Sequence, residues 1–151
     1  MSRPALFLCL ALLVSPLANA NCWKEAGDIY RLDPWLLYSI AKKESGMRVS
    51  VVNTNKDGSQ DLGLMQINSI HLDKLAKYGI TREKLLTDPC INIKVGAWIL
   101  SWNVHRHGYN KFSLGAYNAG TRQNETQERR RDAYANSVLG IYWQETSKFR
   151  Q

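Results

Sequence analysis

Apolar residues recur at helical spacing through most of the chain after residue 21, and this pattern predicts a mainly helical domain. Asp33 and Pro34 suit the start of one helix, and Gly46 suits its end. The run INIKVGAWILSW is apolar nearly all round, which is typical of a central, buried helix. We expect helices at about residues 22–32, 34–45, 69–79, 81–86, 89–107, across FSLGAYN, and at 131–147.

The helical pattern breaks between residues 49 and 61. The segment VSVVNTNKDGSQD begins with β-branched residues and continues with turn-forming ones. Asp57 followed by Gly58 is a hairpin-turn signal, so we expect a small irregular β-hairpin here. The polar stretch GTRQNETQERRR, which precedes the last expected helix, has the composition of an irregular segment.

The first 20 residues have the organisation of a signal peptide. Arg3 precedes the apolar run ALFLCLALLV, and the sequence ANA at 18–20 matches a cleavage site. The apolar run is short for a bilayer span, although a retained anchor is the alternative. We therefore expect cleavage near Ala20, a periplasmic location, and a single domain over residues 21–151.

Export would leave two cysteines, Cys22 and Cys90, in an oxidising compartment. We expect them to form a disulfide, with two unpaired buried thiols as the alternative. The chain has no Cys-x-x-Cys motif, and its two neighbouring histidines, His105 and His107, lack a third ligand at helical spacing, so we expect no metal site.

The formal net charge of +7 favours a polyanionic partner, or it serves only solubility. Nucleic acid is disfavoured because the exported chain has no nucleic-acid motif. Peptidoglycan, with its carboxylates, and anionic lipid headgroups remain. We expect the protein to be a monomer.

Three motifs lie at the ends of expected elements: AKKESG, NTNKDGSQDLGLMQIN and GAYNAG. Together they resemble the lytic transglycosylases, specifically small exported forms associated with envelope-spanning secretion and pilus machines. They are also similar to animal lysozymes, which carry a helix-end Glu-Ser pair and Asp-x-Gly-x-x-Gln-Ile-Asn. The resemblance covers roughly residues 22–145 and implies a lysozyme-like α+β fold in which the hairpin forms one wall of a cleft.

The resemblance also implies roles for individual residues. Glu44 is the expected catalytic acid and base, and Asp61, at the lysozyme spacing from it, is the expected second carboxylate. Many transglycosylases have no acid at that position, so Asp61 could instead cap the turn that follows. The expected substrate-binding residues are Ser45, Gly63, Met65, Gln66, Asn68, Tyr117, Asn118 and Tyr134. Arg130 and Arg131 stand where larger transglycosylases carry a Glu-Thr pair ahead of the tyrosine.

Physical chemistry agrees with these roles. Glycosidic cleavage needs a proton on the leaving oxygen while positive charge builds on the sugar. A carboxyl group can deliver that proton at neutral pH if apolar surroundings raise its pKa. Gly63 permits close backbone approach, and the amides of Gln66 and Asn68 match sugar hydroxyls. Alternatively, those amides satisfy buried backbone, and Tyr117 and Tyr134 belong to the core together with the five tryptophans.

We therefore expect a peptidoglycan lytic transglycosylase that cuts the bond between N-acetylmuramic acid and N-acetylglucosamine, leaves a 1,6-anhydro product, and needs no cofactor. It would open the wall locally for an envelope-spanning secretion or pilus apparatus. One alternative is a hydrolytic muramidase that uses Glu44 and Asp61. The other is a wall-binding assembly protein without catalysis.

Overall fold

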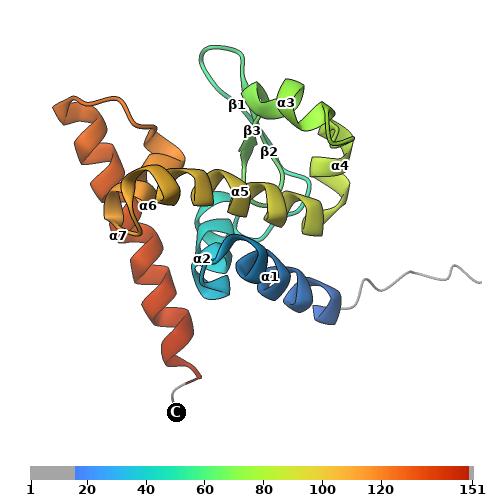
Figure 1. Cartoon of the computed structure of the whole chain (residues 1–151), viewed down its shortest axis with the longest axis horizontal. Helices are drawn as coiled ribbons and strands as arrows, with labels where there is room; N and C mark the ends of the chain where they lie inside the picture. The colour runs from blue at the N-terminus through green and yellow to red at the C-terminus, as the bar shows by residue number, and fades with distance from the viewer. Residues whose placement is uncertain (1–15, 150–151) are drawn as a thin grey trace, which may run out of the picture.

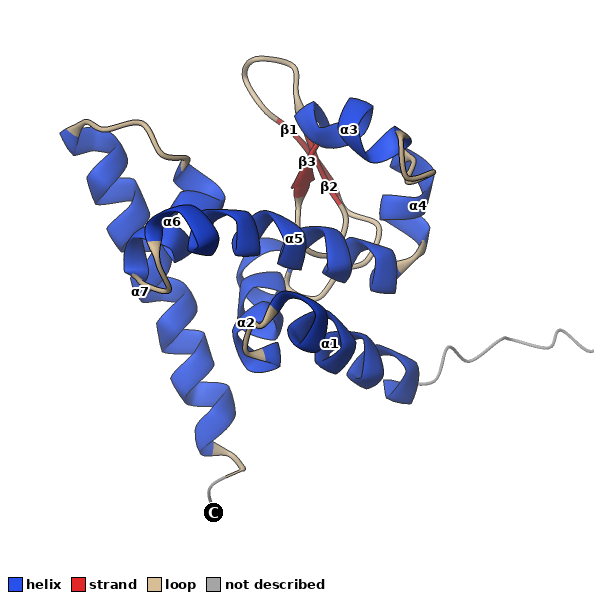
Figure 2. Ribbon diagram, viewed as in Figure 1, coloured by secondary structure: helices blue, strands red, loops and turns tan. Residues whose placement is uncertain are grey.

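The computed structural model describes residues 16–149, and of residues 16–20 it describes the backbone alone. It is mainly helical with one small antiparallel sheet, as predicted (Figures 1 and 2). The helices are α1 (Pro16–Tyr30), α2 (Pro34–Ser45), α3 (Leu72–Ala76), α4 (Arg82–Thr87), α5 (Pro89–His107), α6 (Lys111–Ala119) and α7 (Glu125–Ser147), with a 3-10 turn, η1, at Ser69–His71. The strands are β1 (Val52–Thr54), β2 (Gln60–Leu62) and β3 (Ile67–Asn68).

Helix α5 runs through the middle of the molecule (Figure 1). In that view α1 lies on one side of it, the sheet with α3 and α4 on the other, and α6 and α7 at its far end. One face of α5 enters the core through residues such as Ile93, Ala97 and Leu100. The expectation of a central, buried helix is confirmed for this face only, because Trp102 is 51% exposed and carries the guanidinium of Arg106 over its ring at 4.6 Å.

Helix α2 begins and ends where its sequence predicts. The Asp33 carboxylate accepts a hydrogen bond from the Trp35 backbone N–H at 2.8 Å, so it caps the helix as expected. Gly46 adopts the left-handed conformation at the other end, with φ of 61°. Glu44 therefore lies in the last turn of a helix whose opposite face is core.

The hairpin after α2 is present, and a third strand extends it. The sheet order is β1-β2-β3, and the register places Asp61 between Asn53 and Asn68. Residues 55–59 form the loop, which is longer than the two-residue turn that Asp57-Gly58 signals. The Asn55 backbone N–H donates to the Ser59 carbonyl and closes this loop.

The helix expected over residues 69–79 is broken. It starts as η1 because the Asn68 side chain accepts a hydrogen bond from the Ile70 backbone N–H, and it continues as the five-residue α3. The chain then turns and enters α4, which Thr81 caps. In this segment, η1 and α4 both contact β2, and α4 also contacts α5.

Helix α7 begins at Glu125 rather than at residue 131, so the predicted irregular segment is confirmed for residues 120–124 and wrong for residues 125–131. Asn124 caps the helix, and Glu125 and Glu128 lie in its first turn, where negative charge is favoured. Arg131 is buried and donates hydrogen bonds to the carbonyl groups of Gly120 and Arg122. A single buried arginine thus orders a stretch whose composition is that of a loop.

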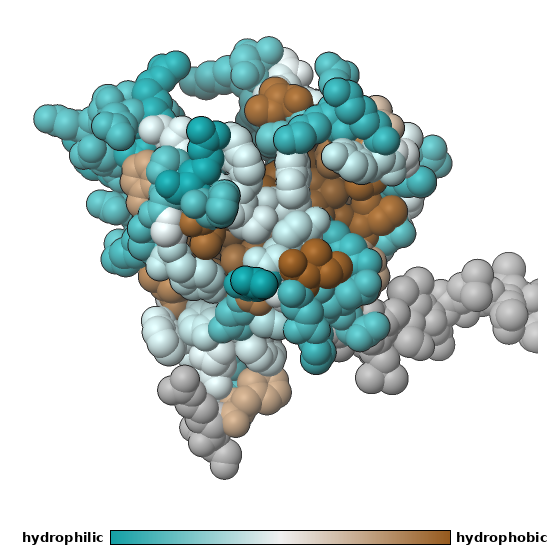
Figure 3. All heavy atoms as spheres, in the orientation of Figure 1, coloured by the Kyte–Doolittle hydropathy of each residue, from teal (hydrophilic) through white to brown (hydrophobic). Residues whose placement is uncertain are grey.

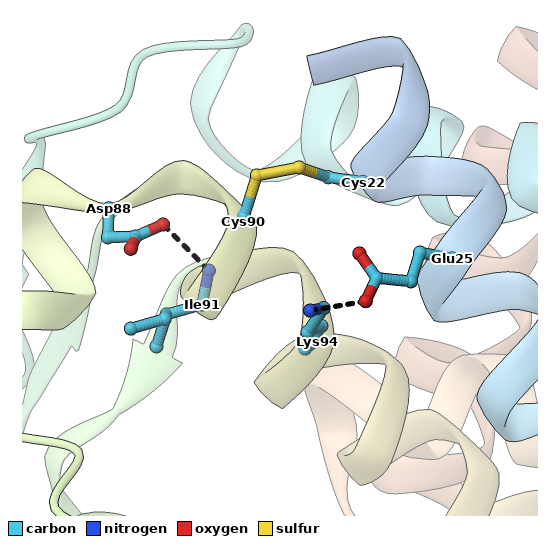
Figure 4. Close-up of a disulfide and its surroundings, with 6 residues drawn as sticks. All are labelled: Cys22, Glu25, Asp88, Cys90, Ile91 and Lys94. Carbon is cyan, nitrogen blue, oxygen red and sulfur yellow. Dashed lines mark hydrogen bonds and ion pairs between the residues drawn. A yellow bond between two sulfur atoms is a disulfide. The ribbon is translucent and has the colours of Figure 1, made fainter. Parts of the chain in front are cut away.

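The predicted disulfide between Cys22 and Cys90 is confirmed, and it joins α1 to the start of α5 (Figure 4). With a sequence separation of 68 residues, it stabilises the fold by about 4 kcal/mol in the chain-entropy model. An ion pair between Lys94 and Glu25, at 2.9 Å, connects the same two helices.

The predicted signal peptide, residues 1–20, lies wholly outside the residues whose side chains are described. Helix α1 starts at Pro16, ahead of the expected start at residue 22, and its backbone runs through the predicted cleavage site. Over the described part of the chain, no helix combines the length and the apolar character that crossing a membrane requires.

Candidate active site

A polar pocket of about 420 Å³ opens between the hairpin and helices α5 and α6. It brings together six of the residues that the sequence singled out: Glu44, Asp61, Gln66, Asn68, Tyr117 and Asn118. Five further residues line it without having been predicted as site residues: Asn55, Asp57, Ser59, His71 and Ile99. The two carboxylates thus share one pocket.

The Glu44 carboxyl is half-buried in this pocket. Burial raises its pKa, the hydrogen bond from Tyr134 opposes that rise, and the negative charge of Asp61 raises it further. The Tyr134 hydroxyl donates to Oε1 of Glu44 at 2.5 Å. A carboxyl group with a raised pKa keeps its proton to higher pH than an ordinary glutamate, as a general acid requires.

Ser45 fixes the chain directly behind Glu44. Its side chain is 2% exposed, and its hydroxyl donates to the Leu64 carbonyl at 2.7 Å and accepts from the Arg48 backbone N–H. Met47 then adopts a left-handed backbone conformation, with φ of 68°, which costs of order 1–3 kcal/mol in a residue other than glycine. Ser45 therefore positions the end of the helix that carries Glu44, and it does not line the pocket.

Asp61 lies in the middle strand and is held by two amides. Its Oδ1 accepts a hydrogen bond from Asn68 Nδ2 at 2.8 Å, and its Oδ2 accepts from Asn55 Nδ2 at 3.0 Å. Neither donor is a backbone N–H, so these contacts do not support the alternative in which Asp61 caps the next turn. They orient both carboxylate oxygens at the pocket wall.

The hairpin loop is held by the carboxylate of Asp57. Oδ1 of Asp57 accepts from the Ser59 backbone N–H at 3.0 Å and from the Ser59 hydroxyl at 2.7 Å, and these bonds lower the pKa of Asp57. The sequence signalled Asp57 as a turn residue only. Its place in the pocket lining follows from the five-residue loop, whose length the Asp57-Gly58 signal did not reveal.

Two tyrosines lie close to Glu44: Tyr117 lines the pocket, and Tyr134 binds Glu44 without lining the pocket. The Tyr117 hydroxyl donates to the Met65 carbonyl at 2.9 Å, and Tyr134 is only 7% exposed. Burial and, after it, the charge of Glu44 hold both phenol pKa values well above their ordinary value, so both rings stay neutral. Tyr134 both belongs to the core and donates a hydrogen bond to Glu44. A place in the core therefore does not exclude a role beside Glu44.

Gly63 and Met65 lie under the pocket and not in its lining. A Cβ on Gly63 would lie 2.4 Å from Asn92 Nδ2 and 2.4 Å from the Leu85 carbonyl, and the residue has φ of 73°. The close approach that makes glycine necessary is therefore to the protein interior, not to a substrate. Met65 is fully buried and packs against Gly96.

Asn92, which the sequence did not single out, holds the backbone around Gly63 and Met65 in place. The side chain is fully buried in α5, its Nδ2 donates to the carbonyl groups of Leu62 and Leu85, and its Oδ1 accepts from the Met65 backbone N–H. The signal that could have found it is an amide inside the most apolar helical run of the chain, where an unpaired polar group is costly.

Gln66 and Asn68 use much of their hydrogen-bonding capacity inside the protein. Gln66 Nε2 donates to the Gly63 carbonyl at 2.9 Å, and its Oε1 accepts from Asn53 Nδ2. Asn68 caps η1 and holds Asp61. Both still face the pocket, so they shape it in addition to presenting polar atoms there.

Within residues 16–149, no three His, Cys, Asp or Glu side chains gather as a metal site would need. Arg131 stabilises the start of α7, because its guanidinium donates a hydrogen bond to the Gly120 carbonyl. The same guanidinium lies over the Phe112 ring at 4.5 Å. It is not part of the pocket lining.

Comparisons with known proteins agree with this geometry. The model of the family "Transglycosylase SLT domain" matches residues 21–139. Invasion protein IagB of Salmonella typhimurium is 46% identical over 125 residues, which cover 83% of this chain and 77% of IagB. The X polypeptide of Escherichia coli is 42% identical over 98% of this chain and 88% of its own. Protein IpgF of Shigella flexneri is 37% identical over 100% of this chain and 97% of its own.

A solved structure shares the fold. An inactive mutant of the lytic transglycosylase Slt from Pseudomonas aeruginosa superposes with a TM-score of 0.63 at 21% sequence identity. The match covers 87% of this chain and 25% of the Slt chain, so the present protein corresponds to about a quarter of that larger one.

Proposed function

Because the chain belongs to the transglycosylase SLT domain family, we propose that it cleaves the β-1,4 bond between N-acetylmuramic acid and N-acetylglucosamine in peptidoglycan, with a 1,6-anhydro product. The observation that carries this proposal is the Glu44 carboxyl group. It is half-buried, bound by Tyr134, and set in a polar pocket opposite a second carboxylate.

In the first step, Glu44 transfers its proton to the leaving glycosidic oxygen as the bond to the muramic acid C1 breaks. Positive charge develops on the sugar ring, and the ionised Asp61 stabilises it. The Glu44 carboxylate then removes the proton from the C6 hydroxyl of the same sugar, and the oxygen closes on C1. This returns Glu44 to its acid form and needs neither water nor cofactor.

The rest of the pocket fits a carbohydrate. Its lining is mainly amide, hydroxyl and carboxylate groups, which exchange hydrogen bonds with sugar hydroxyl and acetamido groups. The positive net charge of the chain complements the carboxylates of the wall. We expect no cofactor at this site.

The test is the variant Glu44→Gln, which keeps the shape of the side chain and cannot donate the proton. Purified peptidoglycan is digested, and the muropeptides are analysed by mass spectrometry. We expect anhydro ends with the wild type and at least a hundredfold loss of rate with the variant. The matched control is Glu83→Gln on the exposed face of α4, which should cleave normally. Near-normal cleavage by a folded Glu44→Gln protein would remove Glu44 from the mechanism.

A hydrolytic muramidase is the second candidate, and the observation that favours it is the orientation of Asp61 by two asparagines. Water then takes the place of the C6 hydroxyl. The same mass spectra decide, because hydrolysis leaves reducing muramic acid and transglycosylation leaves anhydro ends. A wall-binding protein without catalysis would give neither.

We also propose that the protein acts in the periplasm and opens the wall for an envelope-spanning secretion or pilus apparatus. The disulfide supports export to an oxidising compartment. The name of one relative, invasion protein, is in keeping with such an apparatus. N-terminal sequencing of protein from the periplasmic fraction should find Asn21 as the first residue.

A further inference from the structure

A second pocket, of about 400 Å³, lies between α1, α3 and the first half of α5. On the face shown in Figure 3, apolar surface is exposed between the α3–α4 segment and α1. The pocket is lined by Tyr30, Lys74, Leu75, Tyr78, Ile80, Lys94, Val95 and Trp98. None of these residues lines the Glu44 pocket.

The walls of this pocket are apolar and its charges are positive. Tyr78 is 75% exposed, so its ring is open to a ligand. The Lys74 ammonium lies 4.6 Å from the centre of the Trp98 ring, and no described carboxylate forms an ion pair with it. Lys94 already has Glu25 as its partner. The pocket therefore suits an apolar group that carries a carboxylate.

The two pockets lie on either side of one aromatic pair. The rings of His71 and Trp98 meet edge to face, with centroids 5.9 Å apart. His71 lines the Glu44 pocket and Trp98 lines the second one. Ile99, the next residue along α5, again lines the Glu44 pocket. The two pockets are thus separated by a single layer of side chains.

We propose that the second pocket binds the peptide stem of the same peptidoglycan strand that is cut at Glu44. This inference rests on the proposed function. The stem hangs from the lactyl group of the muramic acid and carries carboxylates and alanine methyl groups. One carboxylate contacts the Lys74 ammonium, and methyl groups contact Tyr78 and Trp98. Five extended residues span at most about 17 Å, which is ample for the thickness of one aromatic pair.

A binding experiment tests the pocket without any turnover. Glu44→Gln protein is titrated with free stem pentapeptide, and the Trp98 indole N–H signal is followed by NMR. We expect a saturable shift that Lys74→Met abolishes. The control is Lys24→Met, which removes an exposed lysine from α1 outside the pocket and should leave the shift unchanged. A shift that survives Lys74→Met, or no shift at all, contradicts the proposal.

An activity experiment separates this inference from the proposed function. Anhydro product is measured on intact wall and on glycan strands from which an amidase has removed the stems. We expect Lys74→Met to slow cleavage of intact wall about tenfold, and to leave cleavage of stripped strands unchanged. Absence of anhydro product from both substrates with the wild type contradicts the proposed function. The peptide pocket is contradicted if Lys74→Met cleaves intact wall at the wild-type rate, or if it loses the same amount of activity on both substrates. If the cleavage rates are unchanged and the pocket binds an acidic protein segment, the pocket is instead a docking site for a protein partner.

Discussion

The substitution Asp61→Asn isolates the charge of the second carboxylate. If the side-chain amide of Asn68 flipped, its oxygen would lose the hydrogen bond from the Ile70 backbone N–H. The side-chain oxygen of the new asparagine at position 61 must therefore face the Asn68 amide nitrogen. The amide nitrogen of the new asparagine then faces Asn55. Asn55 is exposed and caps no helix, so its side chain can flip and accept this hydrogen bond through its oxygen. We expect one weakened hydrogen bond, a cost of about 1 kcal/mol, and a fall of roughly 4 °C in melting temperature.

The effect on catalysis should be larger than the effect on folding. A carboxylate about 4 Å from a full positive charge contributes about 4 kcal/mol at an effective dielectric constant near 20. With the sugar charge about half developed in the transition state, this becomes about 2 kcal/mol, or roughly a 30-fold change in rate. At least a tenfold loss of turnover is therefore expected from a variant that remains folded.

The assay is the rate of anhydro-muropeptide release from purified wall, measured with melting curves on the same preparations. The control is Asp73→Asn, on the exposed side of α3. It removes the same charge at a residue that contacts neither Asn55 nor Asn68, and it should keep the wild-type rate. If Asp61→Asn cleaves at the wild-type rate, the charge is dispensable and Glu44 works as the only carboxylate. If its product switches from anhydro to reducing ends, Asp61 governs the competition between the C6 hydroxyl and water.

Three further predictions follow from the site and its supports. Because burial raises the pKa of Glu44, cleavage should fall as pH rises through that raised pKa. The wild type should lose stability relative to Glu44→Gln as pH rises from the ordinary carboxyl pKa through the raised one, and in acid below the ordinary value the difference should no longer change with pH; urea unfolding at several pH values measures this. Gly63→Ala should cost about 2–4 kcal/mol in urea unfolding, whereas Gly79→Ala, equally left-handed but with open space around its Cβ, should cost only about 1 kcal/mol. Reduction of the Cys22–Cys90 disulfide should lower the melting temperature and leave the site intact; two free thiols in denatured, unreduced mature protein, which lacks Cys9, would contradict the bridge.

The sequence was sufficient for features that depend on local chemistry. The cap at Asp33, the stop at Gly46 and the break after it all follow from neighbouring residues, and they place Glu44 at a helix end. The hairpin followed from its turn residues. Its loop length and third strand did not, because β3 has only two residues and is stabilised by pairing with β2.

Long-range contacts explain what sequence reasoning missed. Nothing near Arg131 reveals that its guanidinium will cap carbonyl groups in the preceding loop and extend α7 by a turn and a half. Nothing near Asn92 reveals that it will hold the turn under the pocket. His71 carries no motif either; it reaches the pocket because η1 turns it there after Asn68.

The hydrogen bond between Glu44 and Tyr134 joins residues 90 positions apart, one in the first third of the chain and the other in its last helix. Two more contacts, from Lys42 to Glu145 and from Tyr142 to Asp33, fasten the same two helices. The tyrosine that binds Glu44 is therefore synthesised 90 residues after it. Until α7 docks, the Glu44 carboxyl lacks both its tyrosine and the burial that α7 provides. If Glu44 is the acid that we propose, the surroundings that raise its pKa form only when α7 packs against α2.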